Sequence, residues 1–76
     1  METLKVVVTR GAGLDIHKKV IVASVFTPTL AETRSFGTLT DQLLALADWL
    51  IACGVTHVAL EATGVYGKPV VNVLES

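Results

Sequence analysis

The stretch GLDIHKKVIVASVF, residues 13–26, decides the fold because it predicts two strands joined by a tight basic corner. Leu14–His17 is extended in pattern, and Val20–Phe26 is a nearly continuous apolar run, typical of a strand covered on both faces. Asp15 lies inside the first of these strands, where an unpaired charge is costly. A carboxylate in such a place needs a chemical reason, and the rest of the sequence offers one.

The clearest element downstream is a helix that starts at Thr38–Asp41 and stops at Gly54. Its start offers a hydroxyl side chain as a cap and an acid in the first turn, and glycine is a common residue just after a helix. Apolar residues follow at helical spacing: Leu43, Leu46, Ala47 and Leu50, with Leu44 and Ile51 widening the stripe. We expect this stripe to pack against the sheet.

Short apolar segments before and after this helix predict the other elements. Glu32–Gly37 alternates weakly and predicts an edge-like third strand, while Val55–Glu61 predicts a short buried strand. Lys5–Thr9, which is β-branched, predicts an early strand, and Gly13 is then expected to be a bulge or a close backbone approach. Pro69 suits the first turn of a last helix.

The resulting element order is β-β-β-α-β-α, which predicts an α/β fold with a mixed sheet. A helix between two strands implies a parallel crossover connection. The last helix runs to Ser76 without a cap, so we expect the chain to be truncated before the last elements of its fold.

Length and composition set limits on the function. The 76 residues form one domain at most, and 51% hydrophobic with 17% charged residues excludes a disordered chain. No apolar run is long enough for a membrane span, no signal peptide is present, and the single Cys53 cannot form an internal disulfide, so we expect a cytoplasmic protein. A net charge of −1 gives no overall electrostatic attraction to nucleic acid, so any basic surface must be local.

Two acids are candidates for one site. Residues two apart share a face of a strand, so Asp15 lies with His17, and Glu61 lies with His57. If the crossover places these strands side by side, the two carboxylates are close and repel each other unless a cation lies between them. Hard oxygen ligands suit Mg²⁺ or Mn²⁺, and pairs of such ions promote displacement at phosphorus.

The spacing leaves a plainer alternative open. Asp15 can pair with Lys18 or Lys19 at the strand end, and Glu61 can simply mark the exit of its strand. The two lysines can hold a phosphate backbone or form a solvated corner. Thr63 can approach a substrate or metal, and Lys68 near a helix start can bind an anion.

The remaining polar and aromatic candidates have simpler interpretations. His17 can act on the metal's outer sphere, contact a phosphate, or be a polar strand end. A zinc site formed by His17 and His57 lacks the usual short ligand spacing and is not expected. Trp49 and Cys53 are expected to pack in the core.

Two segments carry a resemblance to a known family. GLDIHKKVIVASV (residues 13–25) and EATGVYGKPVVNVLE (residues 61–75) together resemble the N-terminal part of DEDD-type insertion-sequence transposases. The resemblance implies that residues 1–76 are the N-terminal portion of a single catalytic domain with an RNase H-like fold, of the Holliday-junction-resolvase (RuvC) type. It also implies that Asp15 and Glu61 are the first two acids of the catalytic and metal-binding quartet, the other two lying beyond Ser76.

The activity implied by this resemblance is metal-dependent DNA strand cleavage and joining in transposition, with Mg²⁺ or Mn²⁺ as cofactor in the complete protein. The implied partners are DNA, a structured guide RNA, the remainder of the transposase chain and a second copy of the protein. A chain with half of the acids is expected to be inactive alone. Two alternatives remain: a noncatalytic remnant that self-associates, and a sugar-kinase or actin-type nucleotide-binding module. The corner at Lys18 and Lys19 lacks the glycine that the second alternative needs.

Overall fold

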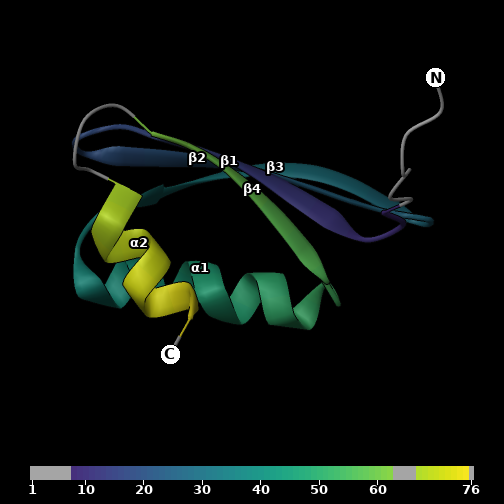
Figure 1. Ribbon diagram of the computed structural model, residues 1–76. Helices are drawn as coiled ribbons and strands as arrows, with labels where there is room; N and C mark the ends of the chain where they lie inside the picture. The colour runs from purple at the N-terminus through teal and green to yellow at the C-terminus, as the bar shows by residue number, and fades with distance from the viewer. Residues whose placement is uncertain (1–7, 63–66, 76) are drawn as a thin grey trace, which may run out of the picture.

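The computed structural model describes residues 8–62 and 67–75, which form a four-stranded mixed sheet and two helices (Figure 1). The elements are β1 (Gly11–Ile16), β2 (Val20–Thr27), β3 (Leu30–Gly37), α1 (Thr40–Ala52), β4 (His57–Ala62) and α2 (Gly67–Leu74). The strand order is β3-β2-β1-β4, in which β1 pairs antiparallel with β2 and parallel with β4. The predicted α/β class and the order β-β-β-α-β-α of an RNase H-like sheet are confirmed.

Both helices lie on the same face of the sheet and enclose the core there (Figure 1). Alternate residues of β1 and β2 point to this face, as the two-residue period of a strand requires. The buried hydrophobic residues are Ala12, Leu14, Ile16, Ile21, Ala23, Val25, Leu43, Leu46, Trp49, Leu50 and Val70. Trp49 packs against Phe36 with ring centroids 5.7 Å apart, which confirms its expected packing role.

No described element covers the opposite face of the sheet, so one expectation for β2 was wrong. The strand is buried on the helix side only, and Val20, Ser24 and Phe26 are exposed on the other side. The apolar run misled because Val20, Val22 and Phe26 are apolar although they lie on the side of β2 that no described element covers. We call the uncovered side, which carries Gly13, Asp15, Ser24, Ala59 and Glu61, the open face.

Three strand predictions needed correction. Gly13 is neither a bulge nor a close contact, since β1 pairs continuously on both sides and a Cβ built there meets nothing within 4 Å. Val8–Arg10 precedes β1 without strand structure, and residues 5–7 of the predicted Lys5–Thr9 strand lie outside the described residues. β4 is exposed along its length rather than buried, because it forms an edge of the sheet.

Helix α1 departs from expectation at its start and in the width of its stripe. Its N-cap is Leu39, whose side chain has no hydrogen-bonding group, and the Thr38 hydroxyl donates to the Lys18 carbonyl oxygen at 3.1 Å. Leu44 and Ile51 are 52% and 75% exposed and so do not belong to the buried stripe. The stop at Gly54 is confirmed, because its φ of 72° lies in the left-handed region that favours glycine.

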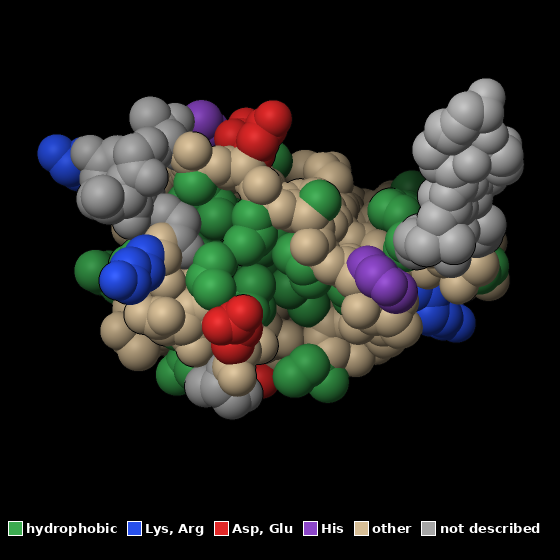
Figure 2. All heavy atoms as spheres, viewed as in Figure 1, with side chains coloured by type: hydrophobic (Ala, Val, Ile, Leu, Met, Phe, Trp, Pro, Cys, Tyr) green, Lys and Arg blue, Asp and Glu red, His purple; other side chains and the backbone are tan. Residues whose placement is uncertain are grey.

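Hydrophobic side chains also remain exposed along β4. Val58 and Leu60 are 39% and 41% exposed on the helix side, and Figure 2 shows hydrophobic side chains gathered over β4 and beside α2. In the described part of the chain, neither helix has the length and apolar composition needed to cross a membrane.

Candidate functional site

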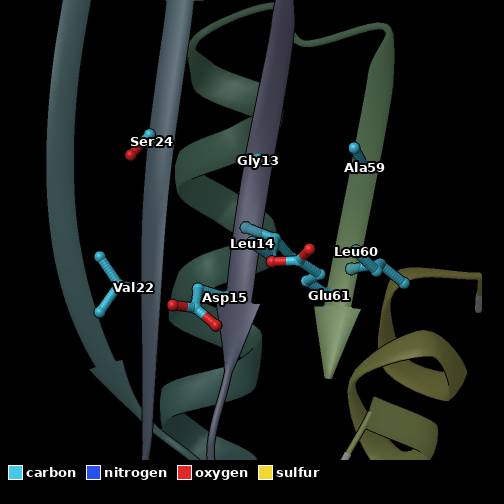
Figure 3. Close-up of a pocket in the computed structure, with 8 residues that line it drawn as sticks. All are labelled: Gly13, Leu14, Asp15, Val22, Ser24, Ala59, Leu60 and Glu61. Atoms are coloured by element: carbon cyan, nitrogen blue, oxygen red, sulfur yellow. The ribbon is translucent and has the colours of Figure 1, made fainter. Parts of the chain in front are cut away.

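The parallel pairing of β1 with β4 brings the two candidate acids together. Asp15 is the in-register partner of Glu61, and each is the second-to-last residue of its strand. Paired residues of neighbouring strands point to the same side, so both carboxylates lie on the open face. In Figure 3 the Glu61 side chain extends from β4 toward β1, while the Asp15 carboxylate leans from β1 toward β2 and α1 passes behind the sheet.

A shallow hollow of about 490 Å³ lies in front of these two acids (Figure 3). Its lining consists of Gly13, Leu14, Asp15, Val22, Ser24, Ala59, Leu60 and Glu61. Small residues from three adjacent strands, Ser24, Gly13 and Ala59, pair in one row across its floor. The acids therefore lie at the border of a space that is open to an incoming molecule.

The ionisable side chain in contact with Asp15 is a histidine rather than a lysine. His17 Nε2 lies 3.2 Å from Asp15 Oδ2, and the two side chains are 49% and 58% exposed. Lys18 and Lys19 are exposed at the corner and form no ion pair with Asp15. The plainer alternative, a pairing of Asp15 with one of these lysines, is therefore absent from the structure.

The other candidate residues gather at the end of the sheet where β1 and β4 finish. Lys18 and Lys19 follow β1, and Lys68 is exposed in the first turn of α2, which follows β4 in the chain. Thr63 lies outside the described residues. All three lysines are exposed, and they are close in the sequence to the ends of the two strands that carry the acids.

His57 does not join the site. It pairs with Gly11 at the start of β4, while His17 follows the end of β1, so the two histidines lie at opposite ends of parallel strands. The His57 ring nitrogen Nδ1 shares a hydrogen bond of 2.9 Å with the Thr56 hydroxyl instead. The structure thus does not bring together the two histidines that a zinc site would need.

The donor set fits a hard divalent cation bound mainly by water. In residues 8–62 and 67–75, no group of three or more His, Cys, Asp or Glu side chains is arranged to hold a metal ion. The described residues therefore provide a metal ion with two carboxylates at this site, those of Asp15 and Glu61. Mg²⁺ is commonly bound in this way, by one or two carboxylates with several waters retained, and Mn²⁺ prefers similar oxygen ligands.

A comparison with protein families identifies the family of this chain. A transposase family model, that of the DEDD transposases of the IS110 type, matches residues 12–76. The chain belongs to this transposase family. The matched segment contains both Asp15 and Glu61, and DEDD transposases generally act on DNA with divalent metal ions. No curated protein matches this chain.

Sequence reasoning did not identify the floor of the hollow. Ser24, Val22 and Ala59 line it, and none of them was a candidate, because small and apolar residues in strands carry no chemical signal of their own. A signal was nevertheless present in the strand period. Gly13 and Ala59 lie two residues before Asp15 and Glu61, and Ser24 lies two residues after Val22, which pairs with Asp15, so all three share the face of the acids.

Proposed function

We propose that residues 1–76 are the N-terminal portion of a single RNase H-like transposase catalytic domain. In this proposal Asp15 and Glu61 supply two ligands to the metal centre that cleaves and joins DNA strands. The observation that carries the proposal is the in-register placement of the two carboxylates on the open face, within a chain that belongs to the transposase family.

The role of each acid follows from its chemistry. Two carboxylates on adjacent strands repel each other, and a divalent ion between them turns this repulsion into attraction. A bound Mg²⁺ or Mn²⁺ activates a nucleophile and stabilises charge at the phosphorus atom. The strands hold the two ligands on a rigid sheet, while the open face admits the DNA backbone. We propose that Asp15 and Glu61 act together with the two further acids of the family's quartet and that the 76 residues alone do not cleave DNA.

Contacts with DNA are proposed at the same end of the sheet. Lys18, Lys19 and Lys68 are exposed beyond the ends of β1 and β4, where they can neutralise phosphates on either side of the acids. Thr63, which lies between β4 and α2 in the sequence, is proposed as a further contact. A guide RNA, the remainder of the transposase and a second copy of the chain are the other proposed partners.

Self-association is a second candidate function, favoured by one observation. Among residues 8–62 and 67–75, β4 pairs with β1 and with no other strand, so its other edge carries backbone groups without a partner from these residues, and Val58 and Leu60 are exposed beside that edge. Edge strands of this kind pair readily with further strands. This role is compatible with the first proposal, because it uses the edge of β4 rather than the open face.

A Mn²⁺ titration of the 76-residue chain, followed by electron paramagnetic resonance of the free ion, tests the metal centre. We expect Asp15→Asn and Glu61→Gln each to weaken binding by more than about tenfold, or about 1.4 kcal/mol, because each removes one charged ligand. Asp48→Asn, which removes an exposed acid from α1, is the matched control and should leave the affinity unchanged. Binding that survives both site substitutions would contradict the proposal.

A further inference from the structure

One contact at the site involves a residue to which the two-acid proposal assigns no role. His17 Nε2 lies 3.2 Å from Asp15 Oδ2, a close contact between an imidazole nitrogen and a carboxylate oxygen. The in-register neighbours of Asp15 are Val22 on β2 and Glu61 on β4, one apolar and one acidic. Among the described residues, His17 is therefore the side chain whose nitrogen lies against the Asp15 carboxylate.

The backbone holds His17 in position for this contact. Its N–H donates to the Val20 carbonyl oxygen at 2.9 Å, which closes the corner between β1 and β2. The residue lies two positions after Asp15, so the strand period places both side chains on the open face. The contact is thus a local consequence of strand and corner geometry and needs no long-range packing.

We infer that His17 is a positioning residue for Asp15, an inference that rests on the proposed function. Its Nε2–H donates to Asp15 Oδ2 and fixes the orientation of the carboxylate, so that the other oxygen stays available for the ion shared with Glu61. Hydrogen-bond partners of metal-binding carboxylates restrict their orientation in this way, and their loss typically weakens metal affinity by about 10–100-fold. The Nε2–H donor is present in protonated histidine and in one neutral tautomer.

If His17 only stabilised the fold, its removal would lower the melting temperature. Both side chains are about half exposed, and ion pairs at such sites contribute little to the stability of a folded protein. Removal of His17 should therefore leave the melting temperature nearly unchanged. A change in metal affinity without a change in stability distinguishes positioning from packing.

The test compares Mn²⁺ binding of the 76-residue chain with that of three variants, by the paramagnetic resonance of free Mn²⁺. We expect His17→Ala to raise the Kd about tenfold, and His17→Gln, which keeps an N–H donor, to stay within about threefold of the original chain. His57→Ala is the matched control, a histidine on the same face that pairs with Gly11 at the far end of β4, and it should change nothing. The carboxyl ¹³C signal of Asp15 should shift in the Ala variant and be restored in the Gln variant.

The outcomes separate this inference from the proposed function. A His17→Ala variant that binds Mn²⁺ as tightly as the original chain, or more tightly, overturns the inference and leaves the two-acid site intact. Loss of affinity that glutamine fails to restore also overturns it. A chain that binds no Mn²⁺, or binds it equally after Asp15→Asn, overturns the proposed function as well.

Discussion

Asp15→Asn is expected to abolish transposition by the transposase that contains this chain. The substitution keeps the shape of the side chain and removes its charge, so a metal ion loses one ligand while the fold is retained, since Asp15 is exposed on the open face. A metal centre supplies several kcal/mol of transition-state stabilisation, so we expect a fall of at least about 10³-fold, equivalent to about 4 kcal/mol. Counting transposition events of a marked element in cells measures the effect.

The controls for this prediction lie in the same chain. Glu61→Gln should be as severe as Asp15→Asn, and the double variant should be no worse than either, because ligands of one ion act as a unit. Asp48→Asn on α1 should transpose normally, since that acid is exposed on a helix on the other side of the sheet. Transposition near the original level in the Asp15→Asn protein would show that Asp15 is not a metal ligand.

Leu46→Ala is expected to lower the stability of the folded chain severely. Leu46 is fully buried between α1 and the sheet, and such a truncation costs about 2–5 kcal/mol through lost burial and the cavity left behind. Small domains bury little surface and have little stability in reserve, so this loss is a large part of the total. In a thermal melt followed by circular dichroism we expect the midpoint to fall by more than about 10 °C.

The matched comparison uses a second leucine of the same helix. Leu44 is 52% exposed, so Leu44→Ala removes the same atoms with little lost burial and should shift the midpoint only slightly. Equal shifts in the two variants would contradict the assignment of the core face of α1.

The sequence was sufficient to predict the elements that periodicity controls. Alternation placed Asp15 and Glu61 on definite faces, and the helix between β3 and β4 implied a parallel crossover. The sequence left the pairing of β4 with β1 as a condition, which the structure meets. The helical stripe of Leu43, Leu46 and Leu50 identified the core side of α1. These features are local or follow from general rules of connection, which is why residues alone were enough.

Other features depend on tertiary neighbours that a sequence does not show. The apolar composition of β4 gave no sign that the strand forms an edge of the sheet, because edge and central strands can share one composition. Gly13 was expected to be a bulge or a close backbone approach. Its lack of a side chain instead leaves space in the hollow, and the strand is not bent there. A hydroxyl cap was expected within Thr38–Asp41, but the N-cap is Leu39, and the Thr38 hydroxyl donates to the Lys18 carbonyl oxygen.

The central claim is that Asp15 and Glu61 hold one divalent ion between neighbouring parallel strands. Anomalous diffraction from a crystal of the chain grown with Mn²⁺ tests it most directly, because manganese is located independently of the protein atoms. The account predicts an anomalous peak on the open face with a carboxylate oxygen of each acid about 2.0–2.2 Å away, as Mg²⁺-like coordination requires. A manganese ion bound to only one of the two acids, or bound elsewhere while both carboxylates remain free, would contradict it.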